Sequence, residues 1–197
     1  NQILDLYGEP WQIKEIKAAA SPYYKRIVTL TDESATSRNF VDSLQMLSDE
    51  GYSIDVVFSL HGNEQTISFT DQRYLIESLT QELESKGIKI RVLYQTNCKS
   101  GRAIDNWSYM GVAGCNGTQD NNYLTIFAPS NFVKSWVKGA TYYDAVQYAY
   151  ETEITTLQSY NDKLPILDYI TSGGYLAGST PIVTGKNTQM TKDMYFK

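Results

Sequence analysis

Two short apolar segments, each followed by a reactive side chain, set the strongest limits on how this chain can fold. They are residues 53–62 (SIDVVFSLHG) and residues 88–101 (IKIRVLYQTNCKSG), and each predicts a buried strand. The first leads to His61, the only histidine in the sequence, and the second leads to Cys98. Because α/β folds keep their active sites at the carboxyl ends of parallel strands, we expect a thiol and an imidazole to meet at one edge of the sheet.

The pattern around these two segments predicts an α/β fold. Residues 26–31 (RIVTLT) are expected to form a further buried strand, followed by an amphipathic helix before the strand that ends at His61. A hairpin is expected within residues 62–71, and then a helix capped by Asp71 that leads to the Cys98 strand. This alternation of strands and helices predicts a parallel sheet with helices on both faces.

The rest of the chain is expected to belong to the same domain. Residues 110–117 (MGVAGCNG) predict a short strand, and two helices are expected after it, the first of which begins at Pro129. Residues 1–21 are expected to form an N-terminal arm, and residues 157–197, which lack periodicity, an irregular C-terminal segment that covers the domain or adds an edge strand. Since no repeat or composition break divides the sequence, residues 1–197 are predicted to be a single domain.

Composition and charge argue against several classes of function. The net charge is −5 and no block of basic residues occurs, so nucleic acid is not an expected partner. No apolar run approaches the roughly 18 residues of a membrane-spanning helix. One histidine and two distant cysteines do not have the spacing of a metal site, so neither a metal nor another cofactor is expected. The sequence has sixteen tyrosines, and tyrosine-rich chains are common outside the cytoplasm. A secreted protein whose signal segment precedes Asn1 is therefore one expectation.

Cys98 and His61 have the chemistry of a catalytic dyad. The thiolate is the reactive form of cysteine, and a nearby imidazole can take the thiol proton and later protonate a leaving amine. Gly62 lets the backbone approach a substrate closely, and its N–H can form an oxyanion hole with that of Cys98. Each residue taken alone is more often structural. Two alternatives stay open for the cysteines: a disulfide between Cys98 and Cys115, or two buried thiols. Cys115 is expected to be a buried structural thiol.

These motifs resemble those of the caspase-like cysteine peptidases, the group of caspases, metacaspases, legumains, gingipains and clostripain. Members share an apolar strand that ends in His-Gly and a second one that ends in the catalytic cysteine, as VVFSLHG and IRVLYQTNC do here. Residues 98–101 (CKSG) are similar to the Cys-x-Ser-Gly of metacaspases and legumains. Residues 132–151 (FVKSWVKGATYYDAVQYAYE) are similar to a helix, glycine, helix segment that follows the cysteine strand. The resemblance extends over residues 26–151.

The resemblance implies a cysteine endopeptidase with a caspase-like three-layer sandwich and a mostly parallel central sheet. His61 would be the general acid or base, Cys98 the nucleophile and Gly62 an oxyanion donor, with a protein or peptide as substrate. In several members the residue two positions before the cysteine lines the first specificity pocket and is charged or strongly polar. The residue here is Thr96, which is uncharged.

This departure affects the expected substrate. A threonine cannot neutralise a buried cation, so the pocket is expected to prefer a small or uncharged residue unless Asp105 or Asp120 supplies a carboxylate. Two other functions stay open. One is a catalytically inactive caspase-like module that binds a protein or peptide. The other is a flavodoxin-like binding domain, against which we note that no glycine-rich phosphate loop follows the first predicted strand.

Overall fold

The computed structural model describes residues 9–123, 125–160 and 178–194. Within these residues the protein is a mixed α/β structure with a four-stranded sheet in the order β1-β4-β5-β6. The strands of this sheet are β1 (Ile54–Phe58), β4 (Ile90–Gln95), β5 (Gly114–Thr118) and β6 (Pro181–Thr184). The first three run parallel and β6 pairs antiparallel with β5. A separate hairpin consists of β2 (Thr66–Ser68) and β3 (Arg73–Leu75).

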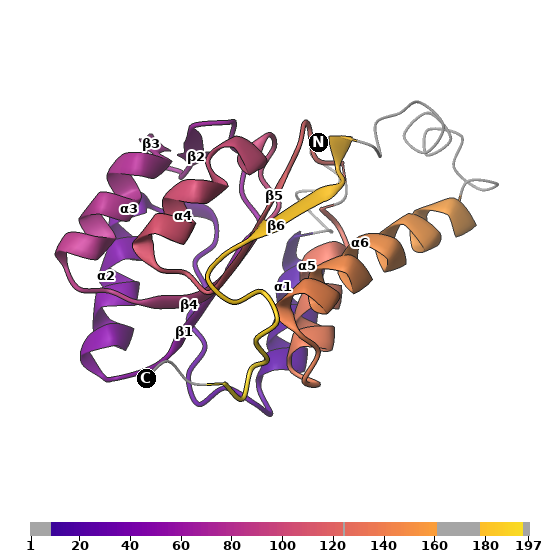
Figure 1. Ribbon diagram of the computed structural model, residues 1–197, viewed down its shortest axis with the longest axis horizontal. Helices are drawn as coiled ribbons and strands as arrows, with labels where there is room; N and C mark the ends of the chain where they lie inside the picture. The colour runs from indigo at the N-terminus through magenta and orange to yellow at the C-terminus, as the bar shows by residue number, and fades with distance from the viewer. Residues whose placement is uncertain (1–8, 124, 161–177, 195–197) are drawn as a thin grey trace.

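Helices cover both faces of the sheet, which gives three layers (Figure 1). The helices are α1 (Glu9–Ala20), α2 (Ser37–Asp49), α3 (Ile76–Ser85), α4 (Ile104–Met110), α5 (Ala128–Trp136) and α6 (Tyr142–Ser159). Two short 3-10 helices, η2 (Asp32–Ser34) and η3 (Ser100–Arg102), lie in connecting segments. Helices α2, α3 and α4 pack on one face, and α1, α5 and α6 pack on the other.

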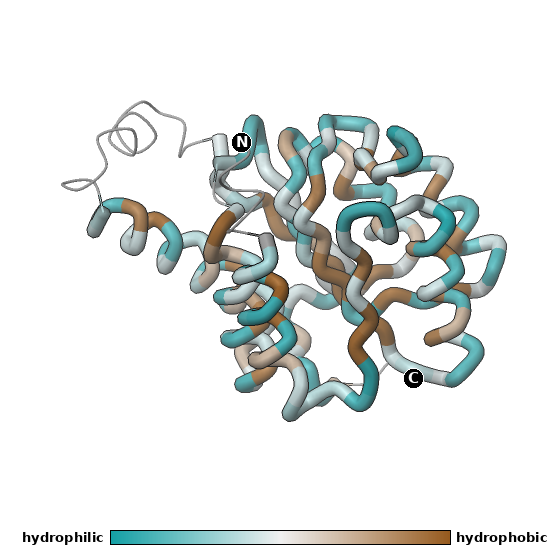
Figure 2. Tube along the Cα trace, turned by 180° about the vertical axis from the view of Figure 1, so that it is seen from behind, coloured by the Kyte–Doolittle hydropathy of each residue, from teal (hydrophilic) through white to brown (hydrophobic). Residues whose placement is uncertain are grey.

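The central strand β4 contributes to both hydrophobic cores. Ile90 and Leu93 belong to the core under α2, α3 and α4, whereas Val92 and Tyr94 belong to the core under α1, α5 and α6. All six residues of β4 are buried, as expected for a parallel strand covered on both faces. The hydrophobic colour in Figure 2 accordingly runs through the middle of the molecule, with hydrophilic segments around it.

Most predicted elements are confirmed, but the predicted first strand is wrong. Residues 26–31 have neither strand nor helix structure. Only Ile27 and Leu30 pack against the cores, and Val28 is 38% exposed. Because most of this segment faces solvent, its apolar residues lie at the border of the domain and not in a buried strand. An apolar run in the sequence does not by itself distinguish these two positions.

The predicted cap of the next helix is also wrong. Asp71 accepts hydrogen bonds from the backbone N–H and the hydroxyl of Ser37, at 2.9 and 2.8 Å, and thus supports the first turn of α2, whose N-cap is Thr36, rather than the helix that follows it. The hairpin is confirmed, but its second strand occupies Arg73–Leu75, and α3 begins only at Ile76. A carboxylate binds the helix start that the tertiary fold brings to it. The sequence prediction instead assigned Asp71 to the helix that follows it in the chain.

The two ends of the chain differ in part from expectation. The predicted N-terminal arm contains α1, and α6 extends to Ser159, slightly into the segment predicted to be irregular. The sequence PIVTG provides the predicted edge strand as β6. A further apolar stretch, residues 164–170, lies outside the described residues.

A buried ion pair joins the amino-terminal ends of β1 and β4. Arg91 donates from Nε and Nη2 to the two carboxylate oxygens of Asp55, both at 2.6 Å, and the side chains are 6% and 8% exposed. The Tyr24 hydroxyl and the Trp136 indole N–H also donate to Asp55, and the remaining guanidinium nitrogen donates to the Lys192 carbonyl at 2.5 Å. The network therefore joins five separate segments of the chain and satisfies the two charges within it.

Removal of this carboxylate is expected to be strongly destabilising. Asp55→Ala leaves the Arg91 guanidinium buried without its partner, which should lower the free energy of unfolding by about 3–5 kcal/mol in urea titrations. Arg26→Ala is the matched control, because it breaks an ion pair with Glu50 whose side chains are 43% and 39% exposed. The control should cost no more than about 1 kcal/mol. Equal losses in the two variants would contradict a structural role for the buried pair.

Candidate active site

The pairing of β1 with β4 brings the two predicted site segments to the same edge of the sheet. The last paired residues are Phe58 and Gln95, and the Thr96 N–H continues the pairing by donating to the Phe58 carbonyl at 3.1 Å. His61 follows Phe58 by three residues, and Cys98 follows Gln95 by three. Because adjacent strands lie about 4.8 Å apart, this register brings the turns that carry the histidine and the cysteine to the same edge of neighbouring strands.

The turn after β1 leaves the Gly62 peptide groups unused by the hairpin. On one side of Gly62 the His61 carbonyl accepts from the Ser68 N–H at 2.9 Å, and on the other the Asn63 N–H donates to the Thr66 carbonyl at 3.0 Å. Gly62 thus sits in a non-hydrogen-bonded antiparallel pair, in which N–H and C=O point away from the partner strand. The His61 side chain is exposed. The Gly62 N–H is therefore available as a donor at this edge.

The turn after β4 is held tightly against β5. The buried Ser100 hydroxyl donates at 2.7 Å to the carbonyl of the residue before Cys98 and accepts from the Thr118 N–H at 3.1 Å. A Cβ on Gly117 would lie 2.6 Å from the Gly101 nitrogen, and one on Gly101 would lie 2.9 Å from the Thr118 carbonyl oxygen. The turn can approach β5 this closely because both positions are glycine, which gives the CKSG sequence a structural reason beyond its chemistry.

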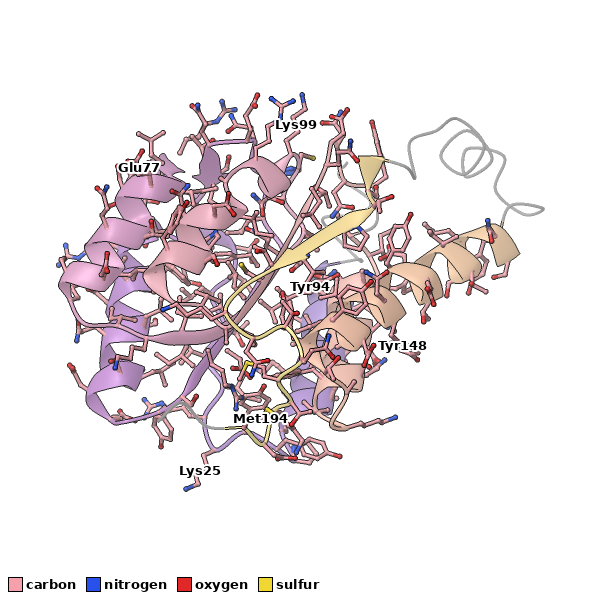
Figure 3. All side chains as sticks on the ribbon, in the orientation of Figure 1. Lys25, Glu77, Tyr94, Lys99, Tyr148 and Met194 are labelled. Carbon is pink, nitrogen blue, oxygen red and sulfur yellow. The ribbon has the colours of Figure 1, made fainter. Side chains whose placement is uncertain are left out.

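A third segment, the loop after β5, reaches the cysteine. The half-buried Cys98 Sγ accepts a hydrogen bond from the backbone N–H of Asn122 at 3.4 Å, and the Asn122 side chain donates to the Thr96 carbonyl at 2.9 Å. Cys98 and Cys115 are both free, so the alternative disulfide is not formed. Lys99 marks this edge of the sheet in Figure 3, and Lys25 and Met194 lie at the opposite edge.

The turns after β1 and β4 touch each other. A Cβ on Gly62 would lie 2.9 Å from Nδ2 and 3.0 Å from Cβ of Asn97, so the glycine backbone packs directly on the residue before the cysteine. An ion pair between Glu64 and Arg102 joins the two turns at the surface. The structure therefore brings together the segments of three of the predicted site residues: His61, Gly62 and Cys98.

The other predicted site residues lie in different surroundings. Thr96 is 3% exposed and its hydroxyl donates to the Phe58 carbonyl at 3.3 Å, so its predicted role in a specificity pocket stays a prediction. Asp105 is exposed on the first turn of α4. Asp120 is exposed beside the cysteine turn, with its carboxylate 3.8 Å from the Lys99 ammonium.

A small hollow borders Asn122. Its walls include Gln95, Asn116, Thr118 and Tyr150, at the carboxyl ends of β4 and β5 and on α6. Among the described residues that line it, none carries a carboxylate, an ammonium or a guanidinium group. The hollow has room for about one water molecule, so it is not a pocket for a substrate side chain.

A buried carboxylate holds the loop that carries Asn122 from behind. Glu153 of α6 is fully buried and accepts from the backbone N–H groups of Ile126 and Ala128 at 2.9 and 2.6 Å, at the start of α5. Gln12 of α1 donates to the Ile126 carbonyl at 3.0 Å. Burial raises the pKa of Glu153 to about 7, although the backbone N–H groups oppose this shift.

No protein-family model and no curated protein sequence matches this chain. In the ranges that the structure describes, no three His, Cys, Asp or Glu side chains gather as they would around a metal ion. No helix in those ranges is long and apolar enough to cross a membrane. The case for a function therefore depends on the geometry of the site.

Sequence reasoning missed three residues of this region: Asn97, Asn122 and Glu153. Asn97 could have been identified from the sequence, because it directly precedes Cys98. Asn122 is 24 residues from Cys98, so no local sequence pattern connects the two. Glu153 lacked a sequence signal, since a charged residue in a helix is usually exposed.

The two thiols are expected to differ sharply in reactivity. Cys115 is fully buried, and burial, with a smaller contribution from Asp105, raises its pKa to about 12. Limited iodoacetamide near neutral pH should therefore label the half-buried Cys98 first, as read by peptide mass mapping. Labelling of Cys115 at an equal rate would contradict the placement of the two residues.

The buried Glu153 should make stability depend on pH. Because its pKa is raised from 4.5 to about 7, the folded protein binds this proton more tightly than the unfolded chain. Its stabilising contribution is thus complete below pH 4.5 and lost as the pH rises through 7, by about 3 kcal/mol. Glu153→Gln, which resembles the protonated form, should remove this dependence. The free energy of unfolding of the variant, relative to that of the parent, should therefore increase between pH 4.5 and 8.

The matched control for this measurement is Glu151→Gln, which removes an exposed carboxylate from the same helix. Solvent screens such a charge, so the control should follow the pH dependence of the parent. An unchanged pH dependence in Glu153→Gln would show that the carboxylate is not held as the structure describes.

Proposed function

We propose that the protein is a caspase-like cysteine endopeptidase in which Cys98 is the nucleophile and His61 the acid–base residue. The observation that carries the proposal is that each residue follows the last pair of two adjacent parallel strands by three positions, with the two turns in contact through Gly62 and Asn97. The mostly parallel sheet between two helical layers supports the proposal at the level of architecture.

The proposed reaction uses groups of this chain alone. The Cys98 sulfur attacks a peptide carbonyl while His61 takes the thiol proton, and the unused Gly62 N–H, with that of Cys98, stabilises the oxyanion. Collapse breaks the C–N bond, and His61 gives its proton to the leaving amine. Water then attacks the thioester, His61 takes a proton from it, and cleavage of the C–S bond returns the thiol and releases the acid.

The surroundings of the cysteine support an uncharged side chain before the cleaved bond. Thr96, two positions before Cys98, is uncharged and 3% exposed, so it offers no charged partner to a buried cation. The carboxylate of Asp120, exposed beside the cysteine turn, is 3.8 Å from the Lys99 ammonium. This agrees with the substrate preference expected from an uncharged Thr96.

A specific observation favours the second candidate, a non-catalytic module that binds a protein or peptide. His61 is exposed, and no hydrogen bond joins it to Cys98 among the described residues. Catalytic hydrogen bonds are often long before substrate binds, so the dyad remains the first candidate.

Two substitutions test the proposal, with the cleavage of a peptide library as the measurement. Cys98→Ala and His61→Ala should each lower the cleavage rate by at least about a thousandfold, because residues that act as a unit do not contribute additively. Cys115→Ala is the control that removes a thiol far from the proposed chemistry, and it should keep the parent rate wherever it remains folded. Cleavage by Cys98→Ala at the parent rate would refute the nucleophile. Peptide binding without cleavage, equal in the parent and in Cys98→Ala, would establish the module instead.

A further inference from the structure

Asn97 is an unusual residue for the place that it occupies. It is 1% exposed, and among the residues that the structure describes neither its side-chain nitrogen nor its side-chain oxygen has a hydrogen-bond partner. Most buried polar side-chain atoms in proteins are paired, and each unpaired one lowers stability. Its backbone is firmly fixed, since its carbonyl accepts from the hydroxyls of Ser100 and Thr118 at 2.7 and 3.3 Å. The unpaired amide therefore lies in a rigid frame.

Gly62 lies against this amide on the side of its Cα where a side chain would stand. The position of a Cβ on Gly62 would be 2.9 Å from Asn97 Nδ2, so the two residues are in direct contact. The hairpin uses neither the N–H nor the C=O of Gly62, because its bonds are made by His61 and Asn63 on either side. An asparagine amide has one acceptor and two donors, which match one peptide N–H and one peptide C=O.

We propose that Asn97 is a positioning residue that binds the Gly62 peptide when the turn after β1 closes onto Cys98. Closure pairs the Asn97 amide with the Gly62 N–H or C=O and moves the adjacent His61 from its exposed position toward the sulfur. The surface ion pair between Glu64 and Arg102 keeps the turn attached while its apex moves. This inference rests on the proposed Cys98–His61 dyad, but it assigns a role to a residue outside the dyad.

The decisive variant is Asn97→Leu, because positioning and packing predict different results. Leucine keeps the branched shape and removes the unpaired polar atoms, so the melting temperature should rise by a few degrees. If Asn97 positions the histidine turn, the same variant should lose the reactivity that Cys98 owes to His61. Greater stability with lower reactivity is not expected of a residue that only packs.

The measurement is the rate at which iodoacetamide alkylates Cys98 between pH 5 and 9, read by peptide mass mapping in the folded protein. His61→Ala should lower the rate at pH 7 about tenfold and change the pH profile, and Asn97→Leu should do the same. Asn97→Ala is the second variant, in case the larger leucine disturbs the packing. The matched control is Trp107→Phe, which removes another buried, unpaired N–H in α4 and should leave the profile unchanged.

The possible outcomes separate this inference from the proposed function. Parent rates in both Asn97 variants, with a slow His61→Ala, would overturn the role of Asn97 and leave the dyad in place. A parent rate in His61→Ala would refute the dyad and the inference together. A fall in melting temperature that accompanies the slower alkylation in both Asn97 variants would assign Asn97 to folding alone. A slower rate at unchanged or higher melting temperature would establish the positioning role.

Discussion

The buried pair of Asp55 and Arg91 fixes the register on which the rest of the structure depends. The pairing of β1 with β4 shifts between Ile54 and Asp55, so that Arg91 is left without a residue directly opposite and extends its guanidinium to the carboxylate. In a sheet with both faces buried, a slip by one residue would turn every side chain to the wrong core. The same slip would change how the turns that carry His61 and Cys98 face each other at the other end of the strands. A charge pair at one edge of the sheet thus contributes to the placement of the turns at the opposite edge.

The two buried polar clusters of the sheet differ in a way that reflects their positions. Around Asp55, the side chains of Tyr24, Arg91 and Trp136 satisfy the carboxylate, and a backbone carbonyl binds the guanidinium, as a rigid structural network requires. At the carboxyl edge, the Asn97 side-chain amide has no partner among the described residues and lies in contact with Gly62, whose peptide groups the hairpin does not use. Unsatisfied groups lower stability, and proteins keep such costs mainly where a functional state uses the groups. The contrast is the physical basis for our view that the turn after β1 has a second position.

Helices on the far face of the sheet also contribute to the site. Glu153 and Gln12, from α6 and α1, hold the start of α5 and the loop before it. That loop carries Asn122, whose backbone N–H reaches the Cys98 sulfur. The surroundings of the cysteine are therefore built from three strand ends and supported by helices that never touch it.

The sequence by itself determined the strands β1 and β4, most helices and the identity of the two reactive residues. These follow from local patterns, since an apolar run before a histidine or a cysteine is visible without any knowledge of contacts. Tertiary structure alone decided that residues 26–31 stay outside the sheet and that Asp71 supports the first turn of α2. It also decided that Asn122 reaches Cys98. Those outcomes depend on which distant groups a segment meets, and hydrogen bonds between residues far apart in the chain leave no periodicity to read.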